Sequence, residues 1–140
     1  MEKESLDNIK VLASLINRLQ LLCEGFDETN KSAVMTAKFK VLLELSFADK
    51  LTPTKLKQSI GLAKSNVAGL CNKLLEEGLI EKIRDTFDNR AIFYRLTQKG
   101  KSELEKDLLK MEKNIKNELE YKNNFDKIEK VSKELLELVK

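Results

Sequence analysis

Residues 51–80 read LTPTKLKQSIGLAKSNVAGLCNKLLEEGLI, and their pattern gives the strongest indication of the fold. It opens with Thr52 and Pro53, a helix-capping residue followed by the residue that best suits the first helical position. We therefore expect a short helix over residues 53–60, ended by Gly61, and a second helix over residues 64–77, ended by Gly78. Two helices separated by a tight glycine-containing turn are typical of a helix-turn-helix.

The expected helix over residues 64–77 has two chemically different faces. Its apolar positions recur at helical spacing and should face the core: Val67, Leu70, Cys71 and Leu74. Its outward face carries small or polar side chains, with a carboxylate only at the C-terminal end: Ser65, Asn66, Ala68, Gly69, Asn72, Lys73 and Glu76. Serine and asparagine can hydrogen-bond to bases or phosphates, and the positive end of the helix dipole near Lys64 favours a phosphate. This face suits a DNA groove, although an ordinary solvent-exposed face has the same pattern.

A β-hairpin should follow the two helices. Residues 79–83 (LIEKI) and 92–96 (IFYRL) are rich in β-branched and aromatic side chains, and the polar stretch 84–90 separates them as an exposed loop. Residues 52–100 carry nine basic and five acidic side chains, a net charge of +4, whereas residues 1–51 and 101–140 carry −1 and 0. The excess positive charge therefore coincides with the motif, as expected of a surface that binds nucleic acid.

Long amphipathic helices flank this region. Apolar residues at three- and four-residue steps predict a helix over residues 6–22 that Gly25 can end, followed by a loop over 27–32. A helix over 33–47, which ends at Phe47, is expected to be wholly packed. After residues 97–100 the periodicity predicts two C-terminal helices with a break at Asn123–Asn124. The expected fold class is mainly α with a small β-hairpin.

The composition excludes several classes of protein. The 140 residues suit one domain, and 41% apolar against 35% charged residues can bury a core. No apolar run is long enough to span a membrane, and the N-terminus lacks the pattern of a secretory signal. The absence of histidine and of a glycine-rich phosphate loop argues against a zinc site, a histidine-based triad and nucleotide-dependent catalysis. We expect a cytoplasmic protein that is not an enzyme and has no catalytic residue, metal site or cofactor.

Three segments together resemble a known family. Residues 51–80, the sequence DNRA at 88–91 and the sequence LTQKG at 96–100 are similar to the winged-helix core of MarR-type regulators, the multiple antibiotic resistance regulator family. The resemblance covers nearly the whole chain, because the order of helices on both sides fits as well. It implies a winged helix-turn-helix with N- and C-terminal dimerisation helices, in which residues 64–77 form the recognition helix and residues 84–90 the wing.

The resemblance also implies roles for individual residues. Arg90 matches the wing arginine that relatives use in the minor groove, and Asp88 matches the acid that braces the base of the wing. The sequence departs from the family pattern at Ala63, where a Ser or Thr cap is common, and at Gly69 and Asn89, where arginines are frequent. The predicted DNA-binding residues combine these matches with the exposed polar positions: Thr54, Lys55, Lys64, Ser65, Asn66, Ala68, Gly69, Asn72, Lys73, Arg84, Asp88 and Arg90.

The terminal helices carry apolar stripes that the small helix-turn-helix cannot cover, and such stripes need a partner. A two-fold homodimer is the simplest arrangement, and it would match a pseudo-palindromic site on double-stranded DNA. We expect a single domain, 1–140, with a winged helix-turn-helix core at 33–100 and dimerisation helices at 1–32 and 101–140. The predicted dimer contacts are apolar: Leu6, Ile9, Leu12, Ile16, Leu119, Phe125, Ile128 and Leu135. The alternative is that these helices pack only within one chain, as a bundle.

Two functions remain open at this stage. The first is a homodimeric, sequence-specific transcription regulator, a repressor whose DNA affinity is modulated by a small ligand of unknown identity. The second is a winged-helix module for protein interactions. A thiol switch is disfavoured, because Cys23 has no neighbouring base that would stabilise a thiolate and Cys71 should point into the core.

Overall fold

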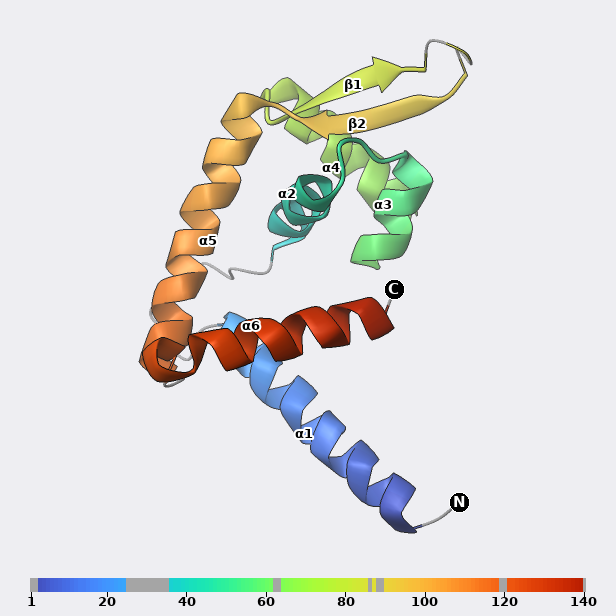
Figure 1. Ribbon diagram of the computed structural model, residues 1–140. Helices are drawn as coiled ribbons and strands as arrows, with labels where there is room; N and C mark the ends of the chain where they lie inside the picture. The colour runs from blue at the N-terminus through green and yellow to red at the C-terminus, as the bar shows by residue number, and fades with distance from the viewer. Residues whose placement is uncertain are drawn as a thin grey trace. The chain divides into compact units, whose positions relative to one another are not determined.

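The computed structural model describes residues 3–24, 36–61, 64–85, 87, 90–118 and 121–139. Along the chain, its elements are α1 (Lys3–Glu24), α2 (Ala37–Phe47), α3 (Pro53–Ile60), α4 (Lys64–Glu76), β1 (Ile80–Arg84), β2 (Ile92–Leu96), α5 (Gln98–Glu118) and α6 (Tyr121–Leu138), as Figure 1 shows. The chain divides into two compact units, Ala33–Leu109 and Met1–Ser32 with Lys110–Lys140. The predicted fold class, mainly α with one small hairpin, is confirmed.

The hydrophobic core of the unit Ala33–Leu109 is drawn from every helix and strand in it. Its buried side chains are Phe39, Val41, Leu42, Leu45, Leu56, Ile60, Val67, Cys71, Leu74, Leu79, Ile80, Tyr94, Leu96 and Leu104. Three of the four predicted core positions of α4 are among them, while Leu70 is half-buried. Because α4 buries this apolar stripe against the rest of the unit, its opposite face is left to solvent.

The ends of α3 and α4 follow the turn chemistry expected from the sequence. Thr52 caps α3, since its Oγ1 accepts a hydrogen bond from the Lys55 N–H at 3.2 Å. Gly61 ends α3 with φ of 71°, and Gly78 follows α4 with φ of 74°. Both angles lie in the left-handed region that favours glycine. These two glycines therefore set where the helices of the helix-turn-helix stop.

The hairpin pairs β1 and β2 in antiparallel register from Ile80 opposite Leu96 to Arg84 opposite Ile92. The first strand begins and ends one residue later than the predicted range 79–83. A further antiparallel bridge joins Leu51 to Tyr94, with N–H···O distances of 3.0 and 2.8 Å. Since α3 starts two residues after Leu51, this bridge ties the start of the helix-turn-helix to the hairpin.

The expectation for the helix at 33–47 is wrong in two respects. Its helix begins at Ala37, because Thr36 is the N-cap and accepts a hydrogen bond from the Phe39 N–H at 3.1 Å. It is also not wholly packed, since Phe47 is 70% exposed. The physical reason is that Phe47 is the last helical residue and the backbone is already extended at Ala48, so the ring lies beyond the last buried turn, which contains Leu45.

The terminal helices agree with the predicted periodicity. Helix α1 covers the predicted range 6–22, and the predicted break at Asn123–Asn124 appears as a non-helical residue inside α6, Asn124, with φ of −125° and ψ of 17°. Gly25, the loop at 27–32 and Leu119 lie outside the described residues, as do the side chains of Cys23 and Phe125. None of the helices in the described part of the chain is long and apolar enough to cross a bilayer.

Candidate nucleic-acid interface

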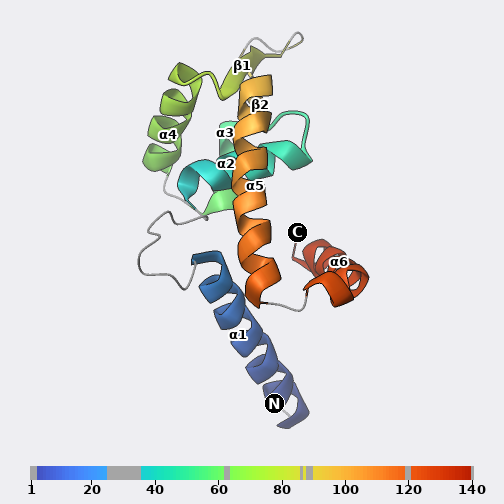
Figure 2. The same ribbon diagram turned by 90° about the vertical axis from the view of Figure 1, so that its left-hand side faces the viewer.

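Helix α4 presents an exposed face of short side chains. The residues on it are Asn66, Ala68, Gly69, Asn72 and Lys73, all exposed. No carboxylate occurs between Asn66 and Lys73. The side chains of Lys64 and Ser65 lie outside the described residues. Figure 2 shows α4 at the edge of its unit, next to α2 and α3. This arrangement offers amide hydrogen-bonding groups and a cation on a face that another molecule can reach.

The first turn of α3 contributes a second exposed group. Thr54 and Lys55 are both exposed, and this turn carries no acidic side chain. The Thr52 cap and the Leu51 bridge hold the backbone at the start of this turn, because Thr52 accepts a hydrogen bond from the Lys55 N–H and Leu51 pairs with Tyr94. Thr54 and Lys55 are therefore presented from a fixed backbone.

The loop between β1 and β2 has one predicted arginine at each end. Arg84, the last residue of β1, and Arg90 are both exposed, while Asp88 and Asn89 lie outside the described residues. The Asp85 N–H extends the strand ladder by donating to the Ala91 carbonyl at 3.0 Å. Its carboxylate Oδ1 accepts a hydrogen bond from the Phe87 N–H at 2.9 Å. Asp85 thus braces the loop through an Asx turn, a role that the sequence analysis did not assign to it.

The basic side chains of residues 52–100 are not equally available to a ligand. Arg95 forms an ion pair with Glu81, its cross-strand neighbour, and its Nε donates to Glu81 Oε1 at 2.7 Å. Lys99 Nζ donates to the Glu77 carbonyl at 2.8 Å. The remaining lysines whose side chains are described are exposed and form no ion pair with other described residues: Lys55, Lys57, Lys73 and Lys82. Arg95 and Lys99 are therefore committed to contacts within the fold.

Cys71 is fully buried in the core, as predicted from its place on the apolar stripe. Burial raises the pKa of its thiol, because the low-dielectric interior disfavours a thiolate. The pKa of Tyr94 is raised as well, by burial first and by the nearby Cys71 second. Both groups stay neutral at physiological pH, so neither acts as a charged group in binding.

We expect Cys71 to be protected from thiol reagents in the folded protein. In a Cys23→Ser variant, Cys71 should react with a disulfide reagent at pH 8 at least about 100-fold more slowly than in the same chain unfolded in urea, because reaction requires local opening and a thiolate. Absorbance of the released thiolate measures both rates. Equal rates in the two states would contradict the buried position.

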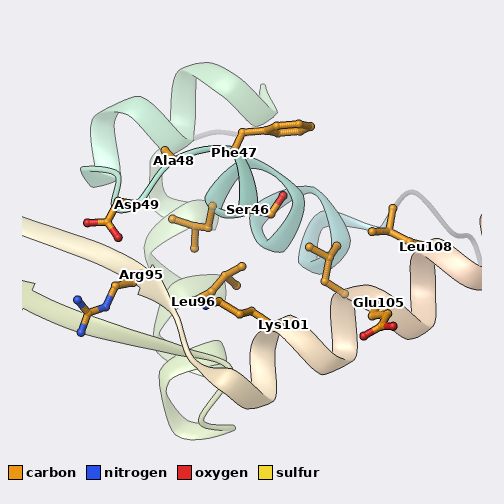
Figure 3. Close-up of a pocket in the computed structure, with 11 residues that line it drawn as sticks. Ser46, Phe47, Ala48, Asp49, Arg95, Leu96, Lys101, Glu105 and Leu108 are labelled. Atoms are coloured by element: carbon orange, nitrogen blue, oxygen red, sulfur yellow. The ribbon is translucent and has the colours of Figure 1, made fainter. Parts of the chain in front are cut away.

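A pocket of about 670 Å³ lies in the same unit, between the end of α2, β2 and the start of α5. Figure 3 shows Ser46 and Phe47 contributed by α2, Arg95 and Leu96 by β2, and Lys101, Glu105 and Leu108 by α5. The pocket thus combines leucine side chains with charged groups of both signs. Its volume falls in the range that holds small organic molecules.

Residues 29–108 match the family of the transcriptional regulator SarA/Rot, and this match covers more than half of the chain. The chain belongs to the SarA/Rot family. Its matched segment contains the helix-turn-helix, the hairpin and the first half of α5, so the family match and the candidate interface fall on the same residues. This SarA/Rot chain also has the MarR fold, so the predicted resemblance to MarR-type regulators is confirmed.

Three known proteins illustrate these similarities. The HTH-type transcriptional repressor YetL of Bacillus subtilis is 36% identical over 73 residues, which are 51% of this chain but 44% of the repressor, so the SarA/Rot chain matches less than half of that relative's length. Wild-type MarR from E. coli has a TM-score of 0.61 at 22% identity over 91% of this chain and 96% of its own. Bordetella bronchiseptica BpsR, whose DNA binding is regulated by 6-hydroxynicotinic acid, has a TM-score of 0.57 at 21% identity over 77% and 83%.

Proposed function

We propose that this SarA/Rot-family chain is a homodimeric repressor that binds double-stranded DNA in a sequence-specific manner. The observation that carries the proposal is the exposed, carboxylate-free face of α4 from Asn66 to Lys73, which belongs to the same compact unit as a hairpin with an arginine at each end. A repressor acting on DNA belongs in the cytoplasm. The proposal makes the protein a binding protein and not an enzyme.

In this proposal α4 enters the major groove. Asn66 and Asn72 reach base edges, because an asparagine amide pairs a donor and an acceptor with adenine. The small residues Ala68 and Gly69 allow the helix to lie close to the bases. Phosphate contacts come from residues that carry charge or hydroxyl groups: Thr54, Lys55, Lys64, Ser65 and Lys73. These contacts position the helix, and the two asparagines supply the sequence preference.

The hairpin loop takes the minor groove. Arg90 is placed in the groove, where a guanidinium is favoured by the negative potential of narrow A·T-rich segments. Arg84 contacts the flanking phosphates, and Asp88 braces the base of the loop. The Asp85 Asx turn supports this role, because it fixes the Phe87 N–H to the Asp85 carboxylate directly after Arg84.

Dimerisation uses the terminal helices. In one copy of the chain, α1 leaves Leu6, Ile9, Leu12 and Ile16 each about half exposed along one stripe. We propose that this stripe joins Leu119, Phe125, Ile128 and Leu135 in a two-fold interface, within dimerisation segments at 1–32 and 101–140 and around a DNA-binding core at 33–100. Such a dimer sets two α4 helices about 34–36 Å apart, one DNA turn, and so matches a pseudo-palindromic site.

A small effector molecule is part of the proposal. BpsR shows that a protein of this fold can have its DNA binding regulated by an aromatic acid. In this chain the pocket between α2, β2 and α5 has the size for such a molecule. Its leucines can contact an aromatic ring and Lys101 can pair with a carboxylate, beside the acidic Asp49 and Glu105. Because β2 lines this pocket, a bound molecule would shift the hairpin relative to α2 and α5.

One observation favours a second candidate function, a module for protein interactions. Phe87, in the hairpin loop, is 99% exposed, and an exposed aromatic ring can anchor a protein interface. The two functions differ in their response to salt. DNA binding requires that the logarithm of the affinity falls steeply with the logarithm of salt concentration, because bound phosphates release counterions. An apolar protein interface has little such dependence.

Two substitutions test the proposed DNA contacts separately. Arg90→Ala should weaken binding to the cognate duplex and to scrambled A·T-rich duplexes alike. It should also reduce the slope of log affinity against log salt concentration by about 1, because one positive charge near the DNA phosphates is lost. Asn72→Ala should instead lose about 1–3 kcal/mol of discrimination at one base pair, with an unchanged salt slope. Fluorescence anisotropy titrations at several salt concentrations measure both.

The matched control is Lys106→Ala, which removes one exposed cation from α5 away from the hairpin and should leave the affinity and the slope unchanged. If Arg90→Ala behaves like Lys106→Ala while the variant remains folded, the loop does not touch DNA and the protein-interaction module is favoured.

A further inference from the structure

Gly69 differs from the other described glycines because none of the described residues requires a glycine at this position. Gly61 and Gly78 adopt positive φ angles, and at Gly100 an added Cβ would overlap the Leu79 carbonyl oxygen. At Gly69 the φ angle is not positive, and an added Cβ would meet no protein atom within 4 Å. Neither the backbone conformation nor the packing of the described residues therefore excludes alanine at this position.

Glycine at this position lowers the stability of the helix. Gly69 lies in the interior of α4, which has 13 residues, and a glycine inside a helix loses more backbone entropy on folding than alanine does. A glycine that destabilises its own helix is useful where another molecule must approach the backbone closely. Gly69 is exposed in the described part of the chain, so a binding partner can reach its backbone.

The neighbours of Gly69 indicate what approaches. Asn66 and Asn72 lie three residues before and after it, on one ridge of α4, and both are exposed. The missing side chain leaves a notch between two amide side chains, and the floor of the notch is the apolar methylene group of the glycine. The two amides match the edge of adenine in the major groove, so A·T pairs are the bases expected beside the notch.

We propose that the notch at Gly69 receives the C5-methyl group of a thymine. This methyl group is the apolar group that projects from an A·T pair into the major groove, and the notch provides apolar surface and space for it. The inference rests on the proposed DNA-binding function and adds a specificity to it, namely one thymine opposite Gly69 in each half-site.

The experiment uses full-length protein and a duplex that the wild type selects from a randomised DNA library. Each thymine is replaced singly by deoxyuridine, which lacks the methyl group. The wild type should lose about fourfold in affinity at one position in each half-site, as expected for one buried methyl group. Gly69→Ala should bind the thymine duplex about tenfold more weakly, and deoxyuridine at that same position should restore most of the lost affinity.

A stability measurement completes the test. Gly69→Ala should raise Tm by about 2–4 °C while it lowers affinity, so the two effects have opposite signs and misfolding cannot explain the loss. The control Ser102→Thr adds one methyl group to an exposed position of α5 and should leave DNA affinity unchanged. The inference is overturned if Gly69→Ala binds the duplex as tightly as the wild type does. It is also overturned if deoxyuridine restores the affinity of Gly69→Ala at no position. Failure of the wild type to select any duplex instead overturns the proposed function.

Discussion

Gly100→Ala is expected to destabilise the winged-helix unit strongly. Gly100 is buried in the first turn of α5, where it packs against Leu79, three residues after the end of α4. An added Cβ would overlap the Leu79 carbonyl oxygen and would lie 3.0 Å from the Leu79 carbonyl carbon and 3.1 Å from Leu96 Cδ2. The closest of these atoms belong to the backbone, which cannot rotate away as the end of a flexible side chain can.

Hydrogen bonds prevent this junction from moving apart. The Thr97 N–H donates to the Leu79 carbonyl at 3.1 Å, and the Thr97 hydroxyl donates to the Gly78 carbonyl at 2.6 Å. The Gly100 N–H in turn donates to Thr97 Oγ1 at 3.1 Å. Relief of the overlap would break several of these bonds, so we expect a loss of about 3 kcal/mol or more in the free energy of unfolding.

Urea unfolding followed by circular dichroism measures this loss. Gly69→Ala provides the matched control, because the same substitution in another helix meets no neighbouring atom and should raise the free energy of unfolding by about 0.5–1 kcal/mol. The two alanine variants should therefore change stability in opposite directions. A midpoint for Gly100→Ala equal to that of the wild type would show that the close approach of α5 to Leu79 is not present in solution.

Leu12→Glu is expected to abolish the proposed dimer. Leu12 lies in the middle of the exposed apolar stripe of α1, and a two-fold interface contains every substituted site twice. Burial of an unpaired carboxylate costs at least about 2 kcal/mol at each site, so the dissociation constant of the dimer should rise by about a thousandfold or more. Sedimentation equilibrium at micromolar concentration should then detect monomers, and affinity for a two-half-site duplex should fall with the dimer.

The control places the same charge on the opposite side of the helix. Ser14 is exposed and lies away from the apolar stripe, so Ser14→Glu should remain dimeric. A dimeric Leu12→Glu variant would exclude this stripe from the interface. A monomeric wild type would favour the alternative in which the terminal helices pack only within one chain.

Features encoded by a few neighbouring residues could be predicted from the sequence. Thr52 with Pro53 marked the start of α3, and Gly61 and Gly78 marked the ends of α3 and α4. The spacing of Val67, Cys71 and Leu74 identified the buried side of α4, and therefore also its exposed side. Each of these predictions depends on the backbone conformation or the periodicity within about one helical turn, which local sequence determines.

The predicted DNA-binding and dimer residues stay predictions, although the structure shows that those with described side chains on α4, α3 and α1 are exposed. Contacts between residues distant in the sequence could not be predicted. Two such contacts are the bridge between Leu51 and Tyr94 and the ion pair of Arg95 with Glu81, and the local Asx turn at Asp85 was not predicted either. Each of the three engages a residue within the fold that local sequence does not distinguish from its neighbours. The exposure of Phe47 could not be predicted, because the periodicity of α2 does not show where the helices and strands that pack against it end.

The two glycines in helical positions, Gly69 and Gly100, separate the two kinds of information. The sequence predicts Gly69 inside a helix and Gly100 just before one, but it does not show which atoms surround either glycine. In the folded chain Gly100 lies against the Leu79 carbonyl, 21 residues earlier, whereas at Gly69 no described residue lies within reach of an added Cβ. The helices, their caps and the apolar stripes could be predicted from local sequence, because they depend on short-range sterics and hydrogen bonds. Which small residue is required for packing and which is free to meet another molecule depends on distances across the chain, and those exist only after it has folded.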